Sequence, residues 1–515
     1  MILSFVRKLL ADAATVPGFQ RALPLLKDGA GRIRVCGLAP SARALYYTLL
    51  YQELGRPVIV VTGDNRAAEE MLPVLQGMCE LTGAADADSV AYLPARDVLP
   101  FENLSPHPEI QEVRARALWR MTSGTASVVV APFAATTIRL RDAAYYQQLA
   151  KTIQRGDWFD LEELVQHLNV VGYRRTDVVE QQGEYALRGG ILDVYSPEME
   201  RPVRLEMSGD EVESLREFDP ASQRSAASVA QVTLLPLTET PVTEELLATI
   251  SARLSGKRVS GSEAALEDVA RAGGVSVFPG WEFFAPVAGA ENTIFHLLPE
   301  AVVVVEEPEQ LETALDAWWE RVRDAHERSG IGNLVHPEEL YVTPEEWRTQ
   351  VQKLSGLDVE QLGLASGEDE LIDFHTHPTA RFHGAVPRLL EEVKKLTAAG
   401  ERVLLAAGSA GELERLADIF NEYQVPYQLG SRGKTAEAAD DEAVESVATT
   451  LVQGYLPNGV ALPDAHLVLF GSDDIFDDSE AGARRQPRTR SKTSAFLSDF
   501  RDLAVGDYVV HVEHG

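Results

Sequence analysis

Cysteines, basic residues and long apolar runs are all scarce in this sequence of 515 residues. Cys36 and Cys79 are its only cysteines, too few for a disulfide framework, which fits a reducing cytoplasm. No stretch approaches the roughly 18 uninterrupted apolar residues of a membrane-spanning helix. The run from Met1 to Ala11 is broken by Arg7 and Lys8, so it predicts an amphipathic helix and not a signal peptide. These absences favour a cytoplasmic protein with no membrane partner.

The balance of charge is strongly acidic, with 79 Asp and Glu residues against 47 Lys and Arg residues and a formal net charge of −32. A protein that grips DNA over much of its surface gains affinity from basic residues that neutralise phosphates. Most of this chain would repel the phosphate backbone instead. Composition therefore favours protein partners over extensive direct contact with nucleic acid, without excluding DNA elsewhere in a larger assembly.

Short apolar strands alternate with helical stretches, which predicts a multidomain α/β fold with parallel sheets. Residues 1–150 form the first such unit, and residues 151–237 are β-rich and predict a small inserted α+β domain. The alternation resumes over residues 238–370, and residues 378–476 predict a further small α/β domain. Residues 477–495 are polar and unpatterned, as in a linker, and residues 496–515 begin another unit.

A phosphate-binding loop is missing from the place where such a fold would carry it. The loop has the pattern G-x-x-x-x-G-K-[ST] between a strand and a helix; its backbone N–H groups and lysine hold phosphates and its hydroxyl holds Mg²⁺. After the strand Ile33–Cys36 the chain keeps the first glycine, Gly37. Ala42 stands in place of the second glycine, Arg43 in place of the lysine and Ala44 in place of the hydroxyl residue. We therefore expect no nucleotide, metal or other cofactor in this chain.

An acidic pair far downstream, Glu306-Glu307, closes the apolar run Val302–Val305. The metal-binding strands of ATP-driven nucleic-acid enzymes end in an Asp-Glu pair, so here a glutamate, one methylene longer, occupies the metal position. Two interpretations stay open on these residues alone. The loop and the pair are either remnants of a lost nucleotide site, or an ordinary strand–helix turn and a solvated strand end.

Three stretches together resemble the N-terminal half of the bacterial transcription-repair coupling factors (Mfd), a half that is itself similar to the excision-repair protein UvrB. The most specific stretch runs from Gly172–Arg175 through Gly183–Asp193 to Ser214–Asp219. Leu99–His107 precedes it, and Gly506–Gly515 resembles the opening of the family's RNA-polymerase-interacting, CarD-like domain. The resemblance covers essentially the whole chain and implies a fragment of about half of a longer protein.

The resemblance implies a degenerate P-loop NTPase fold (RecA/helicase-like, UvrB-like) and a role in transcription-coupled nucleotide excision repair. In the family this half does not hydrolyse ATP, and an ATP-dependent DNA translocase motor lies in the part that is missing here. We therefore expect a non-catalytic scaffold that recruits UvrA to stalled RNA polymerase. The alternative is a UvrB-like ATPase that verifies damage on DNA, but the stretch Tyr92 to Ile110 lacks the tyrosine-rich hairpin that would stack on bases.

The family binds UvrA through the inserted domain, and the matching motif positions imply contacts from Arg188, Arg204 and Ser208. The family's pattern has an aromatic at Ser208, so the apolar contact is either weakened here or shifted to a neighbour such as Met207. Side chains alternate along the predicted strand Pro202–Ser208, which places Arg204 and Ser208 on the face towards solvent or a partner. Arginine suits such a face because its planar fork bonds carboxylates at two points. Without the resemblance, both arginines would pass for solvated strand charges.

Two further clusters carry weaker signals. His375 and His377 resemble the H-x-H pair of metal hydrolases, but the further ligands that those enzymes use are missing, so we expect no metal site. Five cations between Arg484 and Lys492 form the one basic cluster of the chain. This cluster is either a solvated linker or a contact to polymerase or DNA.

Overall fold

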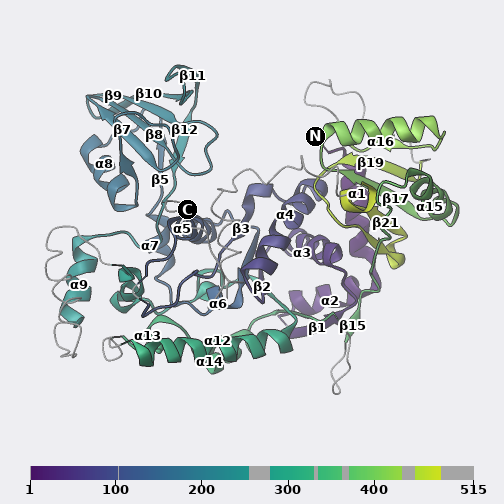
Figure 1. The fold of residues 1–515 in the computed structure, drawn as a ribbon, viewed down its shortest axis with the longest axis horizontal. Helices are drawn as coiled ribbons and strands as arrows, with labels where there is room; N and C mark the ends of the chain where they lie inside the picture. The colour runs from purple at the N-terminus through teal and green to yellow at the C-terminus, as the bar shows by residue number, and fades with distance from the viewer. Residues whose placement is uncertain are drawn as a thin grey trace, which may run out of the picture.

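The computed structural model describes residues 2–29, 31–102, 104–254, 279–329, 335–361, 371–431 and 447–476. Three large sheets and one two-stranded sheet organise this part of the chain. Figure 1 shows a β-rich domain projecting from one end of the molecule and a smaller α/β unit at the other. The predicted linker, the basic cluster at 484–492 and the stretch 496–515 lie outside the described residues.

The central sheet has seven strands in the order β15-β1-β14-β13-β2-β4-β3, and every neighbouring pair is parallel. Three of these strands, β2, β4 and β13, are buried at every position, because helices on both faces of a parallel sheet leave no strand face to solvent. The strands are β1 (Arg32–Cys36), β2 (Val58–Thr62), β3 (Val90–Tyr92), β4 (Val128–Pro132), β13 (Val302–Glu306), β14 (Gly356–Val359) and β15 (Ile372–Asp373).

Alternate side chains of the central strands enter two separate cores. On one face, Val60 and Val304 join a core with α1 (Ser4–Ala11), α2 (Pro17–Lys27), α3 (Pro40–Leu54) and α4 (Asn65–Thr82). On the other face, Val61 and Val305 join a core with elements that include α5 (Pro108–Thr122), α6 (Phe133–Thr136), α12 (Pro308–Arg328) and α14 (Pro344–Gln352). The expected α/β architecture with parallel strands is confirmed, and it is consistent with a P-loop-like multidomain fold.

The inserted domain is a six-stranded sheet in the order β11-β10-β9-β8-β7-β6, antiparallel except for the pair β6 and β7. Tight turns at Gly189-Gly190 and Gly209-Asp210 connect its central hairpins, with positive φ at Gly189 and Gly209. The elements are α8 (Leu161–Val170), β6 (Arg174–Arg175), β7 (Glu184–Arg188), β8 (Ile191–Tyr195), β9 (Val203–Ser208), β10 (Glu211–Phe218) and β11 (Ser225–Ser228). A separate two-stranded ribbon of β5 (Lys151–Gln154) and β12 (Gln231–Leu234) carries the chain in and out of the domain.

The third sheet is mixed, in the order β16-β20-β21-β17-β19-β18. One of its faces packs on α15 (Val386–Ala398) and α16 (Ala410–Glu422), while Leu404 and Val452 on the other face join the same core as α1 to α4. The remaining elements are β16 (His377–Pro378), β17 (Arg402–Ala407), β18 (Gln428–Leu429), β19 (Thr449–Gln453), β20 (Val460–Leu462), β21 (Leu467–Phe470) and α17 (Ser472–Ile475).

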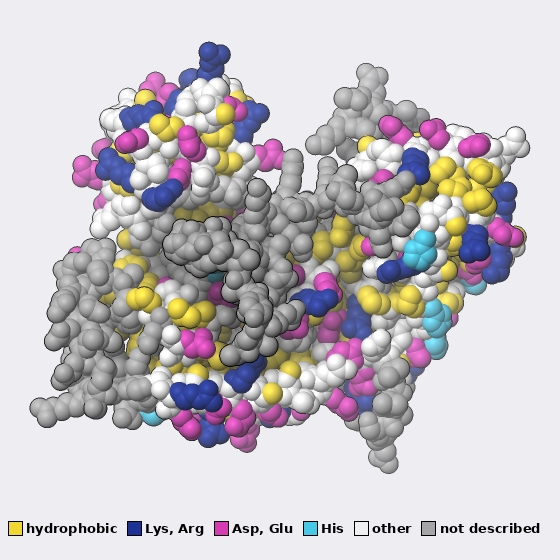
Figure 2. Space-filling model, viewed as in Figure 1, with side chains coloured by type: hydrophobic (Ala, Val, Ile, Leu, Met, Phe, Trp, Pro, Cys, Tyr) yellow, Lys and Arg dark blue, Asp and Glu magenta, His cyan; other side chains and the backbone are white. Residues whose placement is uncertain are grey.

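Charges of both signs are distributed over the projecting β domain. Figure 2 shows Lys and Arg side chains interspersed with Asp and Glu on the projecting β domain, with hydrophobic side chains between them. None of the described helices is long and apolar enough to cross a membrane.

Candidate functional site

The loop Gly37–Ala44 lies where β1 ends and α3 begins, at the carboxyl ends of parallel strands, which is where such sheets bind ligands. In this chain, Asp373 and Thr376 pack against the start of the loop. Gly37 has φ +70°, and a Cβ at this position would collide with Oδ1 of Asp373. The hydroxyl of Thr376 donates to the Gly37 carbonyl (2.7 Å) and accepts from the Ala39 N–H (2.8 Å). Asp373 and Thr376 therefore pack against the start of the loop, and Thr376 already occupies one backbone N–H that could bind a phosphate.

Arg43 meets the acidic pair at the same edge of the sheet. Its Nη2 lies 2.8 Å from Oε1 of Glu307, and its Nη1 lies 3.4 Å from Oε2 of Glu306. Tyr47 donates a further hydrogen bond of 2.8 Å to Oε1 of Glu306. Burial raises the pKa of Glu306, against the opposing effect of Arg43 and the Tyr47 hydroxyl. The arginine at the lysine position thus binds the two carboxylates at the metal position.

These residues do not fit a nucleotide with its magnesium ion. Ala42 and Ala44 are buried and carry no polar side-chain atom. The cation that would bind phosphate and the carboxylates that would bind metal are already paired with each other. The structure therefore brings Arg43, Glu306 and Glu307 together, but as an ion-pair network and not as a nucleotide site.

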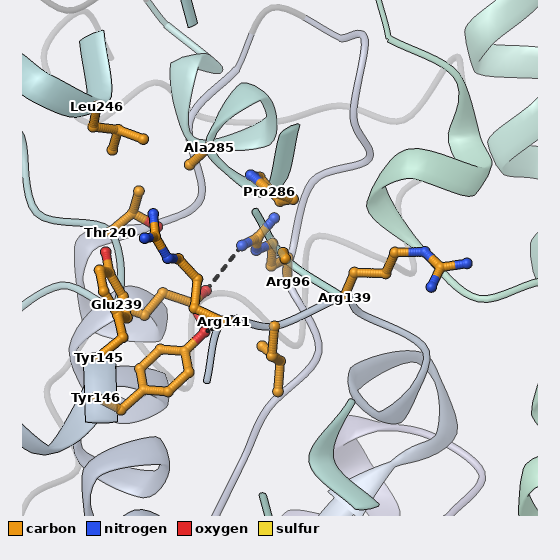
Figure 3. A pocket seen from close by; sticks show the side chains of 12 residues that line it. Arg96, Arg139, Arg141, Tyr145, Tyr146, Glu239, Thr240, Leu246, Ala285 and Pro286 are labelled. Atoms are coloured by element: carbon orange, nitrogen blue, oxygen red, sulfur yellow. Dashed lines mark hydrogen bonds and ion pairs between the residues drawn. The ribbon is translucent and has the colours of Figure 1, made fainter. Parts of the chain in front are cut away.

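A second buried charged cluster was not predicted from the sequence. Arg114 is fully buried and holds Glu239 through two hydrogen bonds of 2.7 and 3.0 Å, and Arg96 adds a third of 3.0 Å. Burial opposes the charge of Glu239, but the two arginines outweigh it and lower its pKa to about 2. Figure 3 shows Arg96 and Glu239 turned towards each other in a pocket that Tyr145 also lines.

The position of Arg114 in α5 is the signal that could have revealed this cluster. Arg114, Leu118 and Met121 follow each other at helical spacing, so an arginine stands on the apolar face of the helix. A buried arginine needs a carboxylate partner. Which carboxylate it finds depends on the fold, because Glu239 is 125 residues away along the chain.

On the inserted domain, the predicted contact residues lie on one face of the sheet. Arg188 pairs with Ile191, Ile191 with Glu206, and Ser208 shares the face of Glu206 by alternation along β9. Arg204 lies on the same face. Arg188 and Ser208 are exposed, and the Arg188 guanidinium donates to the carbonyl of Asp177.

Arg204 is held more firmly than a solvated strand charge. Its Nε and Nη2 lie 2.6 and 2.9 Å from the two carboxylate oxygens of Asp193, and its guanidinium lies 4.8 Å above the ring centre of Phe218. The Arg204 side chain is 17% exposed and that of Asp193 only 2%. The hydrogen bonds to Asp193 raise the pKa of Arg204. The part of the Arg204 guanidinium that reaches solvent is thus held in one position, and the same group neutralises the buried carboxylate of Asp193.

Met207 and Ser208 point to opposite faces of β9. Met207 is half-buried and packs against the core beneath the sheet. Alternation along the strand turns the Met207 side chain inwards, which favours the other alternative, a weakened apolar contact at Ser208.

The histidines of the H-x-H motif are not arranged as a metal site. Nδ1 of His375 lies 3.2 Å from Oδ2 of Asp464, and His377 is exposed in the short strand β16. Within the described ranges, no group of three or more His, Cys, Asp or Glu side chains could hold a metal ion.

Comparison with known proteins agrees with the motifs. The family model described as the UvrB interaction domain matches residues 152–239. A transcription-repair-coupling factor from Myxococcus xanthus is 28% identical over 511 residues, which cover 94% of this chain. This chain is similar to a transcription-repair-coupling factor over almost its whole length. The coupling factor of Staphylococcus aureus (strain USA300) is 21% identical over 509 residues, or 95% of the chain.

The chain spans 42% of the length of either coupling factor. The resemblance proposed from the motifs is thereby confirmed, and the match is consistent with the N-terminal half of such a protein. The matched interaction domain contains Arg188, Arg204 and Ser208.

Proposed function

We propose that this chain is the scaffold part of a transcription-repair coupling factor and that its inserted domain binds UvrA during transcription-coupled nucleotide excision repair. The match of residues 152–239 to the UvrB interaction domain is the observation that carries this proposal. The outer face of that domain carries two arginines, Arg188, which is exposed, and Arg204, which is held by Asp193; arginine is a residue type enriched among interface hot spots.

The proposal includes the absence of ATPase activity in this chain. Asp373 and Thr376 fill the space above Gly37, and Arg43 is paired with Glu306 and Glu307. Nucleotide-driven work on DNA and the contact to RNA polymerase then belong to the rest of the coupling factor. We place the protein in the bacterial cytoplasm, where these partners act.

A capture experiment tests this function. Purified UvrA is titrated onto the immobilised chain and onto an Arg188→Ala variant, and we expect the variant to weaken binding about tenfold or more, since a hot-spot arginine is worth about 1.4 kcal/mol or more. Arg388→Ala is the matched control, an exposed arginine on α15 of the distant α/β unit, and should bind like the wild type.

Two outcomes would contradict the proposal. Absence of UvrA binding by the wild-type chain would remove the docking function. Saturable binding of fluorescent ATP that disappears in Arg43→Ala would replace the scaffold with an active nucleotide site.

A further inference from the structure

One tryptophan on the inserted domain is unusually open to solvent. Trp158 is 71% exposed, whereas Trp281, Trp318, Trp319 and Trp347 are buried. Trp119, the sixth tryptophan of the chain, is half-buried. A side chain of this size is costly to leave in water, and its position on the sheet indicates what could cover it.

Trp158 lies on a short extension of the sheet beside β10. The Val212 N–H donates to the Asp157 carbonyl, the Gly156 N–H donates to the Val212 carbonyl, and Trp158 itself forms a β-bridge with Glu211. The next residue, Phe159, packs against the core beneath the sheet. Because side chains alternate, Trp158 is turned to the outer face.

The register places Trp158 in one row with the predicted docking residues. It pairs with Glu211, and Glu211 pairs with Ser208, so the three side chains share the outer face on successive strands about 4.8 Å apart. Ile191, which is 38% exposed, and Arg188 follow on the next two strands of the same face. A strip that carries Trp158 and Ile191 as apolar side chains, and both Glu211 and Arg188 as charges, thus runs across the end of the sheet.

We propose that Trp158, supported by Ile191, is the apolar anchor of this docking face and supplies the aromatic contact that Ser208 lacks. This inference rests on the proposed function, because its occupant is the same UvrA surface. We expect the UvrA surface to contain an apolar depression deep enough for the indole ring of Trp158, with carboxylates at its rim that bind Arg188. Tryptophan and arginine are the residue types that dominate hot spots of this kind.

The test compares UvrA binding by the wild type, Trp158→Ala, Trp158→Phe and Arg188→Ala. We expect Trp158→Ala to weaken binding about tenfold or more and Trp158→Phe to keep most of the affinity, because a smaller ring still fills the depression. Tyr423→Ala is the matched control, an exposed aromatic (44%) at the end of α16, and should bind like the wild type. Trp158 is largely solvated, so its variants should keep the wild-type thermal unfolding temperature.

A second readout uses the fluorescence of Trp158. Wild-type emission that acrylamide quenches, and that Trp158→Phe lacks, should become protected when UvrA binds. UvrA binding that Arg188→Ala weakens and Trp158→Ala leaves unchanged would overturn this inference and keep the proposed function. No binding by the wild type would overturn both.

Discussion

At the scale of single residues, Arg204 shows that a residue proposed for docking can also stabilise the fold. It neutralises Asp193, which is almost fully buried, through two hydrogen bonds. Removing one partner of a buried pair leaves an uncompensated charge and costs about 3–5 kcal/mol. A loss of UvrA binding in Arg204→Ala would therefore combine a lost contact with a destabilised domain. Arg188 is exposed and donates to the backbone carbonyl of Asp177, so its replacement leaves no buried charge unpaired.

We predict that Arg204→Ala lowers the local stability of β8 and β9 by about 3 kcal/mol or more, since Asp193 then stays buried without a partner. Arg188→Ala should change it by less than about 0.5 kcal/mol, as is usual for an exposed side chain. Hydrogen exchange of the amides in the two strands measures both values. Equal protection in the two variants would show that the Asp193 pair contributes nothing to the domain.

The packing of Asp373 and Thr376 against the loop Gly37–Ala44 leads to a second prediction for single residues. Restoring the motif by Ala42→Gly, Arg43→Lys and Ala44→Ser together should not restore binding of fluorescent ATP. The reason is that Asp373 and Thr376 would still occupy the space above Gly37. Saturable binding by this triple variant, measured by fluorescence anisotropy, would show that the loop sequence alone closed the site.

At the scale of helices and strands, periodicity predicted which elements form but not how they pair. The predicted strand Ile33–Cys36 and the apolar run Val302–Val305 correspond to β1 and β13, and alternation placed Arg204 and Ser208 on the outer face of β9. The partner of Arg204 depends on the register between β8 and β9, which opposes Asp193 to Arg204. Trp158 was missed for the same reason, since its neighbour Glu211 is 53 positions along the chain.

The cluster of Arg96, Arg114 and Glu239 joins α5 to the chain after the inserted domain, and it makes the free energy of unfolding depend on pH. Glu239 has its pKa lowered to about 2, below an ordinary glutamate value of 4.5. Its ion pairs are therefore fully present above about pH 4.5 and are lost as the pH falls towards 2. The shift corresponds to about 3 kcal/mol of unfolding free energy.

We predict that Glu239→Gln is destabilised by about 3–5 kcal/mol at pH 7, because Arg114 stays buried without a counter-charge. The difference in unfolding free energy between the wild type and the variant should become smaller as the pH falls below 4.5, because the wild type then loses the same ion pairs. Urea unfolding at pH 7 and at pH 3 measures the difference. A difference that is equal at both pH values would contradict the assignment.

At the scale of the whole molecule, one core joins the two ends of the described chain. Val6 and Leu10 of α1 share it with Leu404 and Val452 of the third sheet. Arg402 also pairs with Asp12 at 2.6 Å. Periodicity could not predict this packing, because it concerns segments about 390 residues apart. The N-terminal helix, predicted only as amphipathic, turns its apolar side into the seam between the two sheets (Figure 1).

Gly77 lies where α4 packs closely against the unit formed by the third sheet. It lies inside α4, where alanine would normally stabilise the helix by up to about 1 kcal/mol. A Cβ at Gly77 would, however, collide with the carbonyl oxygen of Tyr455 in the third unit. That atom belongs to the backbone, so the cost of overpacking, typically about 1–3 kcal/mol, should outweigh the gain in helix propensity.

We predict that Gly77→Ala lowers the stability of the chain, while Gly411→Ala leaves it unchanged or slightly raises it. Gly411 is the matched control because it also lies in a helix, α16, and a Cβ there would meet no atom within 4 Å. Thermal unfolding of both variants gives the comparison, and limited proteolysis shows whether the two units separate. Equal stability of Gly77→Ala and Gly411→Ala would contradict this prediction. It would mean that α4 and the third sheet can move apart at little cost in free energy, so that the shared core does not fix their arrangement.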